Sequence, residues 1–455
     1  MSEKKSAAFT INMTEGDPTS LLIRFAIPML IGNLFQQFYN IVDSIIVGKF
    51  VGADALASVG ATGSITFLFF ALCNGVGSGG GIITSQAFGV GDEKRIKKCI
   101  SNTSYLMFGM SLVIGTLAFF LATPMLTLLK TPENLMMDAK GYLKLQCFGL
   151  VFVALYNYGS SMLRALGDSK TPLYFLIFSC ILNAGLDILF VYTFDMGVIG
   201  AGIATVISQF ISGAASLVFA WKTNEYFRLT KEDMQPDSDI IESAVKLGVP
   251  LSMQFALIAV SCMALQRVVN DFGETAVSAF TAGSRIEQVI HQPYQTLGAS
   301  LATFCGQNYG ARKNDRLLQG FRKSMKLMII FTLIMLPIMQ IFPRQIVMIF
   351  VDDPDVIEMG ATSLRITSPW YFALGVIYVV RGVLNGIGDA AFAFQNGLVE
   401  VACRLTIPIG LTLIPFIGIW GIWWSAGITW FISGLTAYLR YLSFHKKGLF
   451  AQTAE

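Results

Sequence analysis

Long apolar segments separated by short polar ones recur along the whole chain. Each is close to or longer than the ~20 residues that an α-helix needs to cross ~30 Å of hydrocarbon. The pattern therefore predicts an all-α integral membrane protein with twelve transmembrane helices. The expected segments are 20–47, 56–86, 98–122, 137–163, 171–194, 196–221, 244–269, 276–305, 320–346, 358–384, 390–414 and 418–442.

The second half of the chain repeats the first at a constant offset. The spacing Q-x-x-G at 86–89 recurs at 307–310, and 307 − 86 is 221. The sequence L-R-A-L-G-D at 163–168 recurs as L-N-G-I-G-D at 384–389, again 221 residues later. Because each half contains an even number of helices, both halves have the same orientation and the repeat is parallel. We therefore expect two pseudo-symmetric six-helix bundles.

The distribution of lysine and arginine between alternate loops predicts the orientation. Basic clusters follow the second and eighth apolar segments, at 94–98 and 312–323, whereas the loops on the other side hold few cations. Because cationic loops stay in the cytoplasm, we expect both termini there. The predicted parts are a cytoplasmic tail at 1–19, an N-lobe at 20–221, a cytoplasmic linker at 222–243, a C-lobe at 244–442 and a cytoplasmic tail at 443–455.

Composition argues against other classes of protein. Only 13% of the residues are charged, against about 25% in soluble domains, and 54% are hydrophobic, which is too much for a globular core. The net charge of +3 is modest, and no basic block indicates nucleic acid. The seven cysteines lack Cys-x-x-Cys spacing and are interpreted as small buried apolar residues. No phosphate-loop motif is present, so we expect no cofactor beyond a coupling ion.

Ionisable residues within the apolar segments are functional candidates, because a charge in hydrocarbon costs several kcal/mol. In the first half these are Asp43 in the first segment and Asp187 in the fifth, where Asn183 precedes Asp187 by four residues and shares its helix face. Thr205 in the sixth segment is a fourth candidate oxygen donor. Carboxylate, amide and hydroxyl oxygens suit Na⁺ or a proton better than a transition metal. The pattern predicts a cation-binding site.

The repeat offers an internal control for this prediction. Adding 221 maps Asn183 to Arg404 and Asp187 to Pro408, so the scaffold is duplicated but the acidic site is not. A purely structural pair of aspartates would more readily have been kept in both halves. This difference favours a functional role.

Polar residues of the second half are open to more than one interpretation. Glu400 and Arg404 are spaced i, i+4 and are interpreted as an internal ion pair. His291 follows Glu287 by four residues and is either a proton carrier or, as we favour, a satisfied polar residue near Glu287. Pro28 in the first segment predicts a helix bend.

The chain resembles the multidrug and toxic compound extrusion (MATE) family. The resemblance rests on the twelve segments, on Q-x-x-G with a basic loop after the second and eighth of them, and on R-A-L-G-D-S-K-T-P at 164–172. It implies an antiporter that expels organic cations and other amphipathic compounds in exchange for Na⁺ or H⁺, with two bundles around a central cleft. It also implies a small-molecule substrate, a location in the bacterial inner (plasma) membrane among its lipids, and a monomer.

Site residues can be carried over where the motifs match. The N-lobe cation site of DinF-like and NorM-like members is similar to Asp43, to N-x-x-x-D at 183–187 and to Thr205. NorM-like members carry a glutamate where this chain has Ile258, so the resemblance points to a DinF-like or MepA-like bacterial member. Candidate cleft residues, which packing would explain equally well, are Phe35, Gln36, Tyr39, Asn40, Tyr156, Asn157, Met253, Phe280, Glu287 and His291.

Two other functions compete with efflux. A flippase of lipid-linked saccharides from the same superfamily would carry a cationic cavity and often extra helices, which twelve segments and an anionic N-lobe disfavour. An intramembrane enzyme built on Glu287 and His291 would need a nucleophile or metal ligands nearby, and two histidines in the chain cannot form a His triad.

Overall fold

The computed structural model describes residues 10–128 and 131–446, and the two predicted tails lie partly outside this range. Within it every regular element is helical. In the first half the elements are α1 (Pro18–Phe50), α2 (Ala53–Val90), α3 (Glu93–Leu128), α4 (Glu133–Ala165), α5 (Lys170–Asp187), the π-helix η1 (Ile188–Thr193), α6 (Gly197–Thr223) and the 3-10 helix η2 (Glu225–Phe227).

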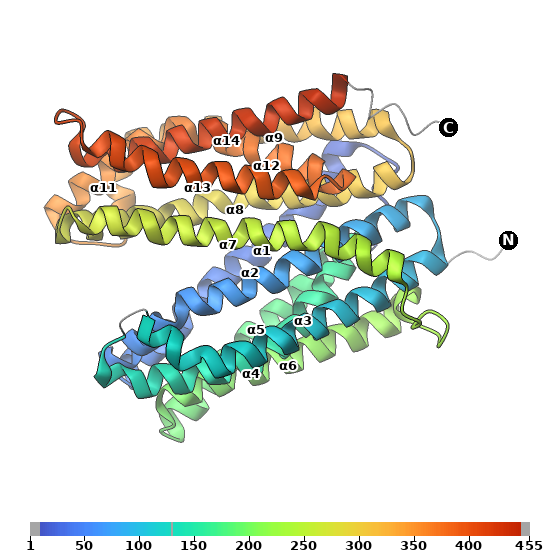
Figure 1. Cartoon of the computed structure of the whole chain (residues 1–455), viewed down its shortest axis with the longest axis horizontal. Coiled ribbons are helices and arrows are strands. Elements are labelled where there is room, and N and C mark those ends of the chain that lie inside the picture. Colours follow the sequence, from blue (N-terminus) through green and yellow to red (C-terminus); the bar gives the residue numbers. More distant parts are fainter. Residues whose placement is uncertain (1–9, 129–130, 447–455) are drawn as a thin grey trace. The chain divides into compact units, whose positions relative to one another are not determined.

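The second half follows the same plan, but two of its predicted segments, 320–346 and 358–384, are each divided. Its elements are α7 (Ser238–Asn270), α8 (Glu274–Gly310), α9 (Asn314–Ile341), α10 (Pro343–Val347), α11 (Pro354–Thr367), the 3-10 helix η3 (Ser368–Trp370), α12 (Tyr371–Ile387), α13 (Ala390–Thr412), η4 (Gly418–Trp420) and α14 (Gly421–Lys446). The predicted segment 358–384 corresponds to α11, η3 and α12, because Pro369 interrupts the regular α-helix. The long helices of each half run side by side (Figure 1).

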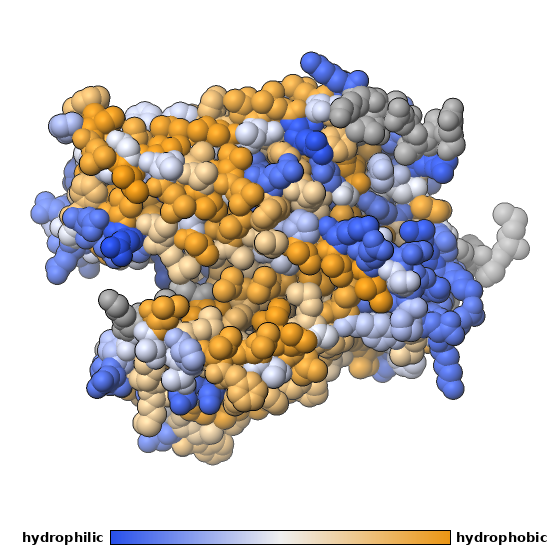
Figure 2. Space-filling view, viewed as in Figure 1, coloured by the Kyte–Doolittle hydropathy of each residue, from blue (hydrophilic) through white to orange (hydrophobic). Residues whose placement is uncertain are grey.

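The helices have the length and polarity of membrane spans. Eight stretches in the described part of the chain are long and apolar enough to cross a bilayer, including α1, α3, α6 and α9. Figure 2 shows hydrophobic side chains over the flanks of the helices and hydrophilic ones gathered near helix ends. The predicted all-helical membrane protein is therefore confirmed.

The chain forms two compact units. The first contains Arg24–Ser252 with residues 10–12, and the second contains 253–446 with residues 13–23. The division falls inside α7 rather than in the predicted linker at 222–243. That segment is docked on α3, because Lys98 Nζ lies 3.0 Å from Asp237 Oδ2 and Tyr105 donates to the carbonyl of Met234 at 2.5 Å.

Glycines in α2 allow close helix packing in the first unit. A Cβ added to Gly80 would lie 2.3 Å from Thr103 Cγ2 on α3, and one added to Gly79 would lie 2.6 Å from the Gly248 nitrogen on α7. Neither position has room for a larger residue. The glycine-rich stretch of α2 is therefore a packing surface for α3 and for the first half of α7.

Candidate functional site

One face of α5 carries a buried row of polar side chains. Ser179, Asn183 and Asp187 follow each other at i, i+4 spacing, and the last two are 1% and 0% exposed. The helix begins at a turn held by Asp168, whose Oδ1 accepts from the backbone nitrogens of Lys170 and Thr171 at 3.0 Å. The sequence spacing thus places Asn183 and Asp187 on one face, as predicted.

The α-helical pattern of α5 ends at Asp187 and continues as the π-helix η1. Such π-turns are rare and are frequently found at functional sites. The hydropathy pattern of 171–194 does not indicate this π-turn. The π-turn places the Asp187 carboxylate at a backbone irregularity.

Two further helices contribute to this face. The carboxyl groups of Asp43 on α1 and Asp187 on α5 are within hydrogen-bonding reach of each other. Tyr39, one turn before Asp43, donates its hydroxyl to Thr205 Oγ1 on α6 at 3.3 Å. The Thr205 hydroxyl in turn donates to the carbonyl of Ala201 at 3.1 Å. The structure therefore brings Asp43 and Asp187 together and links Thr205 to α1 through Tyr39, which had been a cleft candidate.

This arrangement has a definite chemical consequence. Two ionised carboxylates at contact distance in a partly dry site repel each other, so a proton or a cation between them is needed. One oxygen of Asp43, Oδ1, is buried and lacks a hydrogen-bond partner within the described residues. The groups that could coordinate a cation here are carboxylate, amide and hydroxyl oxygens, which are hard ligands that suit Na⁺ or a proton. Across residues 10–128 and 131–446 no group of three or more His, Cys, Asp or Glu could hold a metal ion.

Sequence reasoning missed Tyr142 on α4. Its hydroxyl interacts electrostatically with both Asp43 and Asp187, and its side chain is 8% exposed. Gln146 lies one turn further along the same helix and contacts Tyr142. This polar pair at i, i+4 in an apolar helix is the signal that could have revealed it. Tyr39 and Tyr142 thus place two phenols beside the carboxylates.

The remaining cleft candidates of the first unit have varied surroundings. Tyr156 donates its hydroxyl to the carbonyl of Pro172 at 3.0 Å, which ties α4 to the start of α5. Asn40 accepts from the Ser44 hydroxyl through its carbonyl at 2.8 Å. Phe35 is exposed, and the side chains of Gln36 and Asn157 are partly buried. Tyr156 therefore has a structural role, and the substrate cleft stays a prediction.

The candidates of the second unit also differ from one another. Met253 is exposed on α7, and Phe280 packs against the hydrophobic cluster around Leu265 and Trp423. Glu287 and His291 lie on α8. The ring of His291 meets Trp430 edge to face, with centroids 5.4 Å apart. Its Nε2 is buried without a hydrogen-bond partner in the described part of the chain, so the interpretation of His291 as a satisfied polar residue is wrong.

A second correction concerns Glu400. The expected ion pair with Arg404 on the same helix is not the one that forms, because Glu400 Oε1 instead lies 3.3 Å from Arg381 Nη2 on α12. Arg404 Nη1 contacts the sulfur of Cys262 on α7 at 3.1 Å. Partners on neighbouring helices outcompete the i, i+4 neighbour here.

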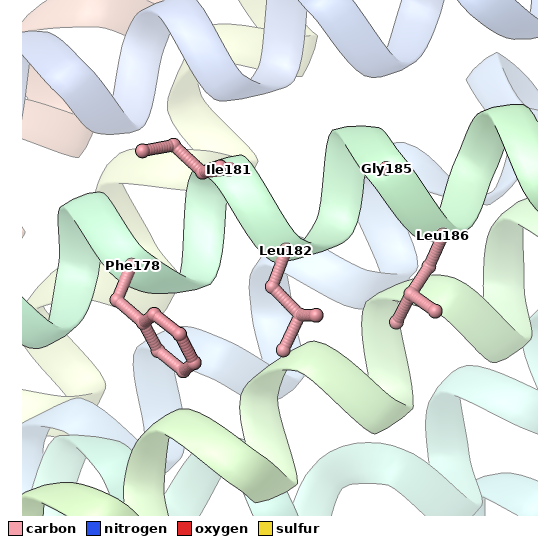
Figure 3. Close-up of a pocket in the computed structure, with 5 residues that line it drawn as sticks. All are labelled: Phe178, Ile181, Leu182, Gly185 and Leu186. Atoms are coloured by element: carbon pink, nitrogen blue, oxygen red, sulfur yellow. The ribbon is translucent and has the colours of Figure 1, made fainter.

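Another face of α5 is an apolar groove. Phe178, Leu182 and Leu186 project to the same side of the helix, while Ile181 points to another side (Figure 3). No charged side chain lines this groove, and Ile181 is 69% exposed. Such a surface suits lipid chains, so the polar chemistry of α5 belongs to the face of Asn183 and Asp187.

Comparisons with known proteins agree with this architecture. The MatE family profile matches the chain twice, over residues 28–189 and 250–412. The chain is 30% identical over 431 residues to "Probable multidrug resistance protein YpnP" of Bacillus subtilis, which covers 94% of this chain and 96% of that protein. It is 22% identical over 420 residues to "Multidrug export protein MepA" of Staphylococcus aureus, covering 92% of both.

Solved structures show the same fold. Crystal structures of MATE in the bent and straight conformations give TM-scores of 0.87 and 0.85 at 22% identity. They cover 96% and 97% of this chain, and 98% and 100% of their own. The two profile matches begin 250 − 28 = 222 residues apart, within one residue of the internal repeat. The chain therefore belongs to the MatE family, whose members are transporters rather than enzymes.

Proposed function

We propose that the protein is a cation-coupled antiporter that exports small amphipathic or cationic organic compounds in exchange for Na⁺ or H⁺. The observation that carries this proposal is the contact between the carboxyl groups of Asp43 and Asp187, which come from two different helices of one unit. The names of the relatives, a multidrug resistance protein and a multidrug export protein, support the export of small molecules.

Coupling follows from competition for negative charge. With a cation or proton between the two carboxylates, α1 and α5 are held together at the site and its net charge falls from −2 to −1. A cationic substrate is then attracted less strongly and leaves. Pro28 lies inside α1 and removes one hydrogen bond from its ladder, which gives this helix a place to bend. The bent and straight conformations of MATE relatives are consistent with such a step.

Transport into liposomes tests the proposal. Purified protein is reconstituted with a fluorescent organic cation, and a Na⁺ gradient and a pH gradient are imposed separately. We expect substrate movement to follow at least one of the gradients and to stop in Asp187→Asn, with the same amount of folded protein in the membrane. Gradient-driven transport by Asp187→Asn at the wild-type rate would contradict the proposed site.

We further propose that the protein lies in the bacterial plasma membrane with both termini in the cytoplasm. The support is the excess of lysine and arginine after α2 and α8 and the acidic residues Asp352, Asp353 and Asp355 at the start of α11. Single cysteines replacing Lys94 and Asp352 on a cysteine-free background test it. An impermeant thiol reagent added to intact cells should label the second and not the first, and the reverse result would invert the topology.

A further inference from the structure

The segment directly before α1 is held by side chains of the second unit. We call residues Met13–Gly16 the anchor segment. Met13 is fully buried although it lies outside any helix. Its backbone nitrogen donates to Gln307 Oε1 at 2.9 Å, and its carbonyl accepts from Asn308 Nδ2 at 3.0 Å. Buried backbone groups need hydrogen-bond partners, and here the end of α8 supplies them.

The start of α9 binds the rest of the anchor segment. Arg316 donates through Nη2 to the carbonyl of Met13 and through Nη1 to the carbonyl of Gly16, both at 3.0 Å. Lys313, directly before α9, donates to the carbonyl of Thr14 at 2.9 Å. Cations therefore bind three carbonyls of this short segment, and hydrogen bonds from charged donors are stronger than those from neutral ones.

Arg316 is itself fixed in place. Its Nε donates to Asn308 Oδ1 at 2.9 Å, and its guanidinium lies over the ring of Phe304, 5.6 Å from the centroid. Each of the three guanidinium nitrogens thus has an acceptor, in a planar fork that a lysine could not reproduce. The hold on the anchor segment therefore depends most on Arg316.

The anchor segment leads directly into α1. Gly16 has a left-handed φ of 87°, and Asp17 Oδ2 accepts from the backbone nitrogen of Ser20 at 2.8 Å, which caps the first turn of the helix. The first turns of α1, up to Ile23, belong to the second unit, whereas the rest of the helix, with Asp43, belongs to the first. One continuous helix is thus shared between the two units.

The repeat shows the same arrangement in the opposite sense. Adding 221 to 13 gives 234, so Met234 precedes α7 as its repeat partner precedes α1. The carbonyl of Met234 accepts from Tyr105 on α3, and the backbone nitrogen of Asp237 donates to Asn102 Oδ1 at 2.9 Å. The first turns of α7, up to Ser252, belong to the first unit and the rest to the second. Because the arrangement occurs twice, it belongs to the plan of the fold.

We propose that the anchor segment couples the two units, with Arg316 as a positioning residue that keeps the first turns of α1 on the second unit. The inference rests on the proposed function, because the cation that acts on α1 binds at Asp43. A change in α1 at the cation site then reaches the second unit through the anchored turns. Pro28 lies 28 − 23 = 5 residues beyond Ile23 and is where α1 can bend between the two. Without the anchor the cation would still bind, but only the first unit would respond.

Amide hydrogen exchange and transport of full-length Arg316→Gln test the inference. In the wild type, saturating Na⁺ should change the exchange rates both in α1 and at the start of α9. In Arg316→Gln, Na⁺ should bind with wild-type affinity and change the exchange rates of α1 alone. Gradient-driven export of an organic cation should fall by about five- to 150-fold, which is the usual range of coupling between two sites.

Two controls accompany this variant. Arg95 on α3 is the repeat partner of Arg316, since 316 − 221 = 95, and is exposed, so Arg95→Gln should change neither measurement. Asn308→Ala is a milder second variant for the case in which Arg316→Gln folds poorly, because the first unit has Ala87 at the corresponding position. It removes one donor to Met13 and the acceptor of Arg316 Nε, so export should fall less while Na⁺ affinity is kept.

Several results would overturn the coupling role. They are wild-type export by folded Arg316→Gln, a loss of Na⁺ affinity in this variant as large as its loss of export, and wild-type exchange rates at the start of α9 that do not respond to Na⁺. Failure of the proposed function is distinguishable, because the wild type would then show no gradient-driven export. The exchange measurement still decides in that case: a Na⁺ response at α9 that Arg316→Gln abolishes supports the anchor, and one that persists refutes it.

Discussion

Replacing one member of the carboxylate pair is the most direct perturbation of this protein. Asp187→Asn leaves the side-chain shape and the α5 helix unchanged but removes one of the two negative charges that meet between α1 and α5. If these charges hold Na⁺ or a proton in turn, Na⁺ affinity should fall and its dependence on pH should disappear. Asp43→Asn should have the same effect, because the site needs both charges.

The size of the effect follows from the geometry. Two unit charges about 4 Å apart interact by about 4 kcal/mol at an effective dielectric constant of about 20. A Na⁺ ion that contacts both carboxylates loses up to this amount when one is neutralised, and solvent relaxation reduces it. With a factor of ten for about 1.4 kcal/mol, we expect Na⁺ affinity to fall between about tenfold and about a thousandfold.

Na⁺ binding to purified protein between pH 5 and pH 8 measures both effects. In the wild type, affinity should fall with decreasing pH by up to about tenfold per unit, because one bound proton must be displaced. In Asp187→Asn it should be weaker and nearly constant over this range. Asp389→Asn is the control: this carboxylate lies in the second unit and pairs with Arg440 at 2.9 Å, so its loss should leave Na⁺ affinity unchanged.

Two results would refute the reasoning. Wild-type affinity that is constant from pH 5 to pH 8 would mean that Na⁺ and H⁺ do not share the site. Wild-type affinity in folded Asp187→Asn would mean that Na⁺ binds elsewhere. A loss of affinity in Asp389→Asn as large as in Asp187→Asn would indicate a general effect on folding, which thermal unfolding of the variants would detect.

Two further predictions concern stability in detergent, measured by thermal unfolding. Gly80→Ala should lower the free energy of unfolding by about 1 to 3 kcal/mol, because the new Cβ would lie 2.3 Å from Thr103 Cγ2. Gly60 is the control on the same helix: a Cβ there has nothing within 4 Å, so Gly60→Ala should be neutral or stabilising by up to about 1 kcal/mol. Equal effects of the two substitutions would contradict the close packing at Gly80. The hydrogen bond from Lys98 lowers the pKa of Asp237 in the folded protein. The ionised carboxylate therefore stabilises the fold fully above its unfolded pKa of about 3.9. This stabilisation is lost as the pH falls through the lower pKa of the folded state. Asp237→Asn should therefore melt earlier than wild type at pH 7, and the two proteins should melt alike once the pH lies below the lowered folded pKa of Asp237. A difference that persists there would exclude the ion pair as its cause.

Features that depend on local sequence could be predicted well. Hydropathy located the helices, because the length needed to cross hydrocarbon is a property of one segment alone. The shared face of Asn183 and Asp187 followed from helical periodicity, and the structure places both on the buried side of α5. The constant offset of 221 residues likewise needed only sequence comparison. The division of the tenth predicted segment, 358–384, could also have been predicted, because Pro369 lies inside it.

Features that depend on helix rotation and neighbours could not be predicted. Glu400 has Arg404 within reach on its own helix, but the rotation of α13 presents it to Arg381 on α12. Tyr142 reaches the carboxylates only because α4 packs beside their helices, which hydropathy does not specify. The polarity of residues 222–243 predicted a linker between the two lobes. In the structure, Glu232 and Asp237 of this segment form ion pairs with Lys94 and Lys98 at the start of α3.

The difference between the two units constrains how an ion could drive transport. The repeat gives both units the same helix plan. Among the described residues of these segments, Asp43 and Asp187 meet from two helices of the first unit, whereas the second unit has Arg404 and Pro408 at the positions that correspond to Asn183 and Asp187. A ligand shifts a conformational equilibrium only by its differential affinity for the two states. Under the proposed function, a cation that binds only the first unit therefore acts on the helices that carry this site, among them α1, α4, α5 and α6. The π-helix η1 directly after Asp187 is a point where α5 can change register with little loss of hydrogen bonding. An asymmetric pair of this kind lets the ion and the substrate occupy chemically different sites, so that one can displace the other without sharing contacts.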